Sequence, residues 1–246
     1  MSRQQRRAAE RKAKKTTKLR HQNMMKKDGQ VIAFHEAGHA VARYLTAEEM
    51  GYSKDECIFW IEISNGSPVL NDSIDGQTIL VTQATTFGPS YSKELDPYFN
   101  DVYAACRKGI GMDLEELQRK AEEAEAAGVD IDKWLKATTL IAVMGPIVEA
   151  QVTKQEVDVV LNSYVAENDV GIFVRNCRIG NRIDEVEEYY DTAVDQAIEH
   201  LGETKTLKAI WDLGTHLMKY GTTDGKTAAR IIKAALEDEQ SNANAA

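Results

Sequence analysis

One segment of the sequence, residues 30–47, reads QVIAFHEAGHAVARYLTA. Seven of its residues are spaced so that they share one broad face of an α-helix, as in an amphipathic helix. That face consists of Val31, Phe34, His35, Gly38, Val41, Ala42 and Leu45. Asp28-Gly29 precedes the stretch and Gly51 follows it, and both are turn signals. The sequence therefore predicts a helix over residues 30–47, with a His-Glu-x-x-His motif from His35 to His39 in its middle.

This motif points to metal chemistry. Residues four apart on an α-helix lie about 6 Å along the axis and about 40° around it, so the imidazoles of His35 and His39 can reach one ion. Neutral imidazole is a good ligand for Zn²⁺. Glu36 projects beside such an ion, where its carboxylate can take a proton from a bound water. The alternative is a pair of histidines that share a helix face and satisfy hydrogen bonds in the core.

A zinc site of this kind needs a third protein ligand. The elongated motif, in which a third histidine follows on the same helix, requires His at position 45, where the sequence has Leu45. His200 and His216 are alternatives, but both lie in polar regions near the end of the chain without a partnering motif. A distant carboxylate remains, and composition alone does not choose among 39 acidic residues.

The rest of the sequence predicts a mainly α fold with a small β-sheet. Residues 57–63 and 78–82 are rich in β-branched and apolar side chains and are expected to be strands. Beyond Phe87, helices are predicted over residues 101–108, 113–127, 132–152, 168–177, 184–200, 204–219 and 226–237. Residues 221–227 have three residues between their glycines, where a phosphate-binding loop has four. We expect a corner between two helices there.

Composition bounds the class of protein. The chain has 246 residues, of which 43% are hydrophobic and 28% charged, as is typical of a soluble globular protein with one domain. No uninterrupted apolar run reaches the roughly 18 residues of a membrane span, and the first residues lack the apolar segment of a secretory signal. Three widely spaced cysteines form no metal-binding knuckle. These features favour a cytoplasmic protein with no membrane span.

The net charge of −9 combines two opposite parts. Residues 1–27 hold eleven Lys or Arg and one acid, whereas the remaining residues hold nineteen bases and 38 acids. We expect a mobile basic tail over residues 1–27 and a folded domain over residues 28–246. The tail's charge suits weak, salt-dependent contact with nucleic acid or an acidic surface. It lacks interleaved aromatic residues, so base stacking is not expected.

The motif and the order of the predicted elements resemble the peptidase domain of the FtsH family of ATP-dependent metallopeptidases. The family's His-Glu-Ala-Gly-His-Ala is present letter for letter as residues 35–40, and a short strand pair follows it. A later family helix carries Gly-Gly-Arg-x-Ala-Glu, which residues 144–149 match weakly. The family's Ala-Ser-Asn-Asp-Leu then opens a further helix, similar to Ala166-Glu167-Asn168-Asp169-Val170. The resemblance covers roughly residues 30–235.

This resemblance implies a zincin-like helical domain and a zinc metalloendopeptidase that hydrolyses peptide bonds through a metal-activated water. His35, His39 and Asp169 would hold Zn²⁺, and Glu36 would be the catalytic base. Glu149 would orient one of the histidines by accepting a hydrogen bond from its ring. A strand edge, at residues 57–63 or 78–82, would pair with the backbone of a peptide or protein substrate.

The sequence also departs from the family. His39 and Asp169 are 130 residues apart, more than is usual in the family, so we expect a helical insertion at about residues 87–132. Pro146 and Ile147 differ from the family's helix motif. The AAA+ ATPase module is missing from this chain, so its hydrolysis is expected to be independent of ATP. An oligomer and a separate ATPase partner stay open.

Two other functions stay open as well. One is a dedicated zincin that clips a single regulator, for which a linked helix-turn-helix domain would be diagnostic; the sequence shows none. The other is a catalytically inactive zinc-binding protein that acts as a binding or regulatory partner, with its site closed to solvent. The start of the chain, with Arg-Arg-Ala-Ala-Glu-Arg at residues 6–11, is similar to the starts of small bacteriophage proteins.

Overall fold

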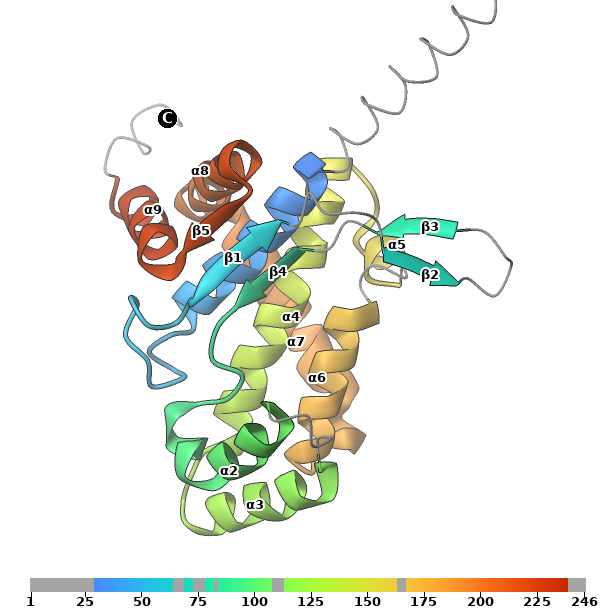
Figure 1. The fold of residues 1–246 in the computed structure, drawn as a ribbon, viewed down its shortest axis with the longest axis vertical. Helices are drawn as coiled ribbons and strands as arrows, with labels where there is room; N and C mark the ends of the chain where they lie inside the picture. The colour runs from blue at the N-terminus through green and yellow to red at the C-terminus, as the bar shows by residue number, and fades with distance from the viewer. Residues whose placement is uncertain are drawn as a thin grey trace, which may run out of the picture.

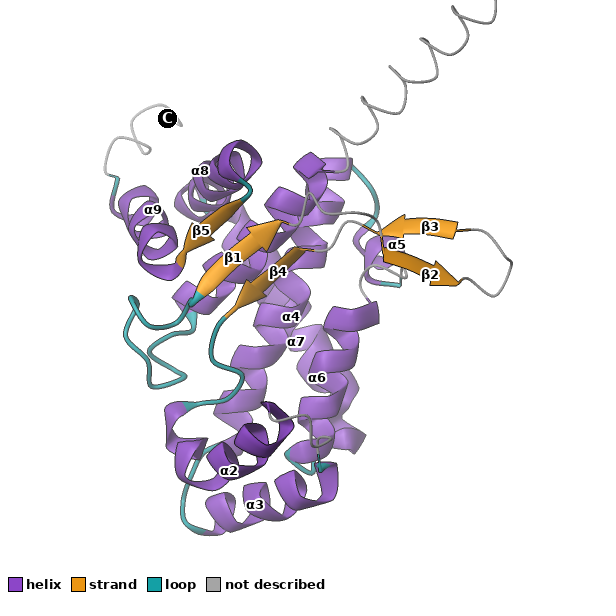
Figure 2. Ribbon diagram, in the orientation of Figure 1, coloured by secondary structure: helices purple, strands orange, loops and turns teal. Residues whose placement is uncertain are grey.

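The computed structural model describes residues 29–63, 69–72, 78–81, 84–107, 113–162 and 167–238. Most of these residues are helical, and a small antiparallel sheet packs against the helices (Figures 1 and 2). The prediction of a mainly α fold with a small β-sheet is therefore confirmed. The expected basic tail, residues 1–27, lies outside the described residues.

The helices agree closely with those predicted. The first described helix, here called the motif helix, covers residues 29–45 and contains the His-Glu-x-x-His motif. The others are α2 (Asp96–Arg107), α3 (Leu114–Ala126), α4 (Ile131–Thr153), α5 (Val157–Leu161), α6 (Glu167–Ile179), α7 (Val186–Gly202), α8 (Thr204–Tyr220) and α9 (Gly225–Glu237). Every helix predicted beyond Phe87 has a counterpart, although α2 begins five residues earlier than expected and the short α5 was not predicted.

The three-stranded sheet has the order β4-β1-β5, and all of its pairings are antiparallel. Its strands are β1 (Trp60–Ile63), β4 (Ala84–Phe87) and β5 (Thr222–Asp224). Alternation along β1 buries Ile61 and Ile63 in the core and exposes Trp60 and Glu62 on the outer face. Figure 1 shows the sheet lying over the motif helix, with α8 and α9 next to β5.

The prediction of a strand at residues 78–82 and that of a corner at residues 221–227 were wrong in their details. The strand at residues 78–82 forms as β3 (Thr78–Val81), but it pairs with β2 (Val69–Asp72) in a separate two-stranded sheet instead of with β1. The corner expected at residues 221–227 contains β5, which pairs with β1. Gly225 permits this pairing, because a Cβ there would lie 1.8 Å from the carbonyl oxygen of Ile58.

These pairings also correct the expected position of a substrate strand. Both edges of β1 are occupied, one by β4 and the other by β5. Within residues 57–63, the part that forms β1 therefore cannot pair with a substrate strand. β3 belongs to the other sheet. In the described part of the chain, β4 and β5 each pair with β1 alone, so each has a second edge without a strand partner, and β5 lies next to α8 and α9.

α4 is the central helix of the fold, and it packs against α5, α6 and α7. By length and composition it is the one described helix that is able to cross a membrane, but 78% of its most apolar 18-residue window is buried inside the protein. Such burial is typical of a core helix, in agreement with the expectation of no membrane span. Pro146 lies within α4, and the helix continues through it to Thr153.

Two clusters of buried side chains meet along α4. The first joins the motif helix, the sheet, α8 and α9, and the second joins α2, α3, α4 and α6. The described parts of the segment predicted as an insertion, residues 87–132, contribute buried side chains to the second cluster. Leu117, Ala121 and Ala124 of α3 are buried there, although the rest of α3 is highly charged.

Candidate metal centre

The motif helix places its polar motif inside the protein. His35, Glu36 and His39 are only 8%, 6% and 8% exposed. They lie where the motif helix crosses α4, and the crossing is close because Gly38 has no side chain. A Cβ at Gly38 would lie 2.9 Å from the carbonyl oxygen of Met144 and 3.1 Å from the Cα of Gly145. The contact between the two helices therefore fixes the position of the histidines.

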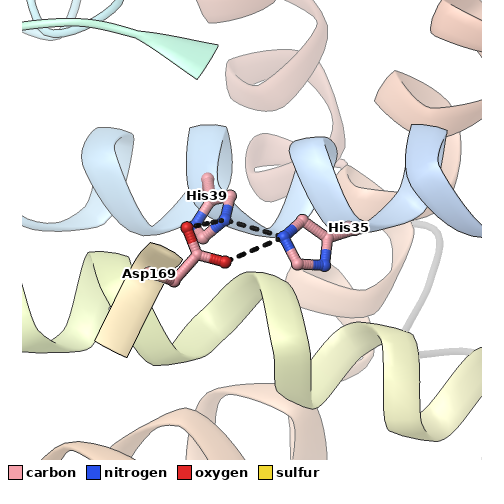
Figure 3. A group of neighbouring side chains, drawn as sticks. All are labelled: His35, His39 and Asp169. Atoms are coloured by element: carbon pink, nitrogen blue, oxygen red, sulfur yellow. Dashed lines mark hydrogen bonds and ion pairs between the residues drawn. The ribbon is translucent and has the colours of Figure 1, made fainter. Parts of the chain in front are cut away.

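His35, His39 and Asp169 come together at this crossing (Figure 3). The Nε2 atoms of the two histidines are 3.0 Å apart. The carboxylate of Asp169 lies 3.2 Å from the Nε2 of His35 and 3.5 Å from the Nε2 of His39. A tetrahedral zinc ion with bonds of about 2.0–2.1 Å separates its ligand atoms by roughly 3.3 Å. The two Asp169 distances involve different oxygens, Oδ2 toward His35 and Oδ1 toward His39. With one ligand atom from each residue, the three atoms lie within 4.8 Å of one another, so the group can hold a metal ion.

Hydrogen bonds fix the orientation of both imidazoles. The Nδ1 of His35 lies 2.9 Å from a carboxylate oxygen of Glu149, and the Nδ1 of His39 lies 2.6 Å from the carbonyl oxygen of Ile141. Both partners can only accept, so each Nδ1 carries the hydrogen. In a neutral imidazole the Nε2 then carries a lone pair. Two lone pairs and a carboxylate therefore face one another, and a cation is required between them.

The electrostatics of the metal-free site follow from the same arrangement. Burial lowers the pKa of His35, but hydrogen bonds to Asp169 and Glu149 and nearby negative charges outweigh burial and raise the pKa to about 10. Burial also acts to raise the pKa of Asp169, but His39 and His35 outweigh it and hold that pKa well below its usual range. Without a metal, a proton on His35 therefore supplies the positive charge that the site requires.

Glu36 lies beside the three-residue group. Its carboxylate oxygen Oε2 accepts a hydrogen bond of 2.7 Å from the hydroxyl of Thr86 on β4. A carboxylate is able to accept a proton, and the role as base that the motif predicts for Glu36 stays a prediction. Thr86 was missed in the sequence, as was the carbonyl oxygen of Ile141. Alternation along residues 84–87 separates Thr86 from Thr85 and Phe87, but the pairing of Thr86 with the buried Ile61 is needed to show that Thr86 lies on the inner face.

Asp169 reaches the histidines from the first turn of α6, where a negative charge is favoured by the helix dipole. The two alternative histidines lie elsewhere, because His200 is on α7 and His216 is on α8. Among the described residues, His35, His39 and Asp169 form the one group of at least three His, Cys, Asp or Glu that can hold a metal ion. The structure thus brings together the ligands that the resemblance implied.

Comparison with known proteins adds no family to this picture. No model of a protein family matches the chain, and no curated protein matches it. The interpretation of the site therefore depends on its own geometry.

Proposed function

We propose that this protein is a zinc-dependent metalloendopeptidase with a zincin-like site, similar to the peptidase domain of the FtsH family. The observation that carries the proposal is the convergence of the His35 and His39 Nε2 atoms on the Asp169 carboxylate, with Glu36 on the next position of the same helix. Two imidazoles and one carboxylate are a common ligand set of catalytic zinc, and they leave the fourth position to water or substrate.

Each residue of the site would have a separate chemical role. His35, His39 and Asp169 would hold the ion, and Zn²⁺ in such a site lowers the pKa of a bound water to about 7 and polarises a carbonyl. Glu36 would accept the proton of the attacking water and return it to the leaving amine. Glu149 and the carbonyl of Ile141 would keep both histidines in the tautomer that presents Nε2.

The free edge of β4 offers a place for an extended peptide. A substrate strand that pairs there is bound through backbone hydrogen bonds, as in other peptide sites built on a sheet edge. The same strand carries Thr86, which contacts Glu36. A peptide on β4 would therefore pass close to the base and the metal ligands. Because hydrolysis by a metal-activated water consumes no ATP, we propose hydrolysis that is independent of ATP.

The ligand set also suits non-haem Fe(II) enzymes, which use two histidines and one carboxylate. Glu36 favours hydrolysis, because a proton acceptor next to the metal serves the activation of water. A second candidate function, a zinc-binding protein without catalysis, is favoured by the low exposure of the site. Only 8% of each histidine is exposed.

One set of measurements tests the proposal. Elemental analysis of the purified protein should find about one zinc per chain, and a quenched fluorescent casein should be cleaved. Glu36→Gln should keep its zinc and lose roughly 10²–10⁴-fold in hydrolysis, whereas Glu62→Gln, on the exposed face of β1, should change neither. Absence of metal binding would contradict the metal site. Zinc binding without hydrolysis in the wild type would favour the non-catalytic function, and iron in place of zinc would point to oxygen chemistry.

A further inference from the structure

Thr86 occupies a particular position on β4. It pairs with Ile61 of β1, a buried residue, so its side chain points toward the inner face of the sheet and the motif helix. Its neighbours Thr85 and Phe87 point to the outer face and are exposed. One strand therefore carries two threonines on opposite faces, and only Thr86 meets the motif.

The hydroxyl of Thr86 contacts Glu36 twice. It lies 2.7 Å from the carboxylate oxygen Oε2 and 3.0 Å from the backbone carbonyl oxygen of Glu36. A hydroxyl has one hydrogen to donate, and the bond to the charged carboxylate is the shorter and the stronger of the two. Threonine also has few rotamers because it is β-branched. The hydroxyl of Thr86, on a strand next to the motif helix, therefore restrains the side chain of Glu36 and lies close to its backbone carbonyl oxygen.

We infer that Thr86 is a positioning residue, which holds the Glu36 carboxylate in the orientation needed for proton transfer. The inference rests on the proposed function for its catalytic meaning. The strand that orients Glu36, β4, is also the strand on which the substrate would pair. One strand would therefore position both the peptide and the base. Misplacement of a reacting group by about 1 Å is enough to lower a rate 100-fold.

Three variants separate this role from a merely structural one. Thr86→Val keeps the shape and removes the hydroxyl, so casein hydrolysis should lose roughly 10–100-fold in kcat, with KM and zinc content unchanged. Thr86→Ser retains the hydroxyl and should restore kcat to within about 3-fold of the wild type. An unchanged kcat in Thr86→Val, or an equal loss in Thr86→Ser, would overturn the inference.

A second measurement needs no activity. The urea midpoint of unfolding should fall more when Thr86→Val is made in the wild type than when it is made in Glu36→Ala, because the carboxylate partner is gone in the latter. Thr85→Val, on the outer face, should shift the midpoint equally in both backgrounds. Equal shifts for Thr86→Val would show that it does not restrain the carboxylate. If the two substitutions are coupled but the wild type cleaves no casein, the contact between Thr86 and Glu36 is retained and the proposed peptidase function is rejected.

Discussion

Gly145→Ala should damage the metal centre with little effect on the fold. A Cβ at position 145 would lie 2.4 Å from the Nε2 of His39, 2.6 Å from its Cε1 and 2.8 Å from its Cδ2. Ordinary contacts begin near 3.4–3.5 Å, so the imidazole must move on the order of 1 Å. That movement is several times the roughly 0.2 Å that a metal–ligand distance tolerates, and it also disturbs the 2.6 Å hydrogen bond to Ile141.

The expected magnitudes follow from these distances. Loss of a partner that orients a ligand lowers metal affinity about 10–100-fold, and displacement of the ligand atom itself should lower zinc affinity by roughly 100-fold or more. Overpacking destabilises by about 1–3 kcal/mol, but alanine in a helix interior regains roughly 0.5–1 kcal/mol over glycine. The metal-free protein should therefore lose at most roughly 2.5 kcal/mol.

Competition with a chromophoric chelator measures the zinc affinity, and urea unfolding of the metal-free protein measures the stability. Gly171→Ala is the matched control, because it is also a helical glycine and a Cβ there has no atom within 4 Å. It should keep the zinc affinity and gain up to about 1 kcal/mol in stability. If Gly145→Ala binds zinc as tightly as the wild type, His39 is not a ligand in the geometry described above.

Three further predictions concern the same centre and the cysteines. Asp169→Asn removes the anionic oxygen, so zinc affinity should fall by roughly 100-fold or more in the chelator assay; an unchanged affinity would leave Asp169 without a role as a ligand. Because the pKa of His35 is raised to about 10, zinc binding at pH 6, where a zinc-bound water with a pKa of about 7 keeps its proton, should release close to one proton, seen by calorimetry in buffers of different ionisation enthalpy. By the same shift, His35 stabilises the metal-free fold fully below its unfolded pKa of 6.5, and this contribution should be lost as the pH rises through 10; urea midpoints that do not fall over this range would contradict it. Burial raises the pKa of Cys57 and Cys177 to about 11, so Ellman's reagent should react with neither at pH 8 until the protein unfolds.

The helices were the most predictable part of the fold, for a local reason. A helical period repeats within a few residues, so the motif helix was predicted at residues 30–47 and is observed from residue 29 to 45. Strand pairing depends on contacts between distant segments, and β1 takes partners from residues 84–87 and 222–224. A three-residue strand between two helices looks like a turn in the sequence. β5 was therefore missed. β4, the four-residue strand at residues 84–87, was missed as well.

The site was predictable in part. The positions of His35, Glu36 and His39 relative to each other follow from the geometry of one helix. Asp169 was selected by resemblance and not by spacing, since no local rule relates residues 130 positions apart. The role of Gly145 was not predictable, because it depends on which turn of α4 meets the imidazole of His39. Thr86 depends in the same way on the register of β4 against β1.

The hydrogen bonds favour a site for a cation over a pair of neutral core histidines. If the two histidines only satisfied hydrogen bonds in the core, each Nε2 would face a donor. Instead the two Nε2 atoms face each other at 3.0 Å and share the carboxylate of Asp169, while Glu149 and Ile141 accept the hydrogens on Nδ1. If both imidazoles are neutral, the two Nε2 atoms and the carboxylate of Asp169 are acceptors without a donor between them, which is unfavourable for buried groups. Only a proton or a metal ion between the two Nε2 atoms and the carboxylate removes the conflict.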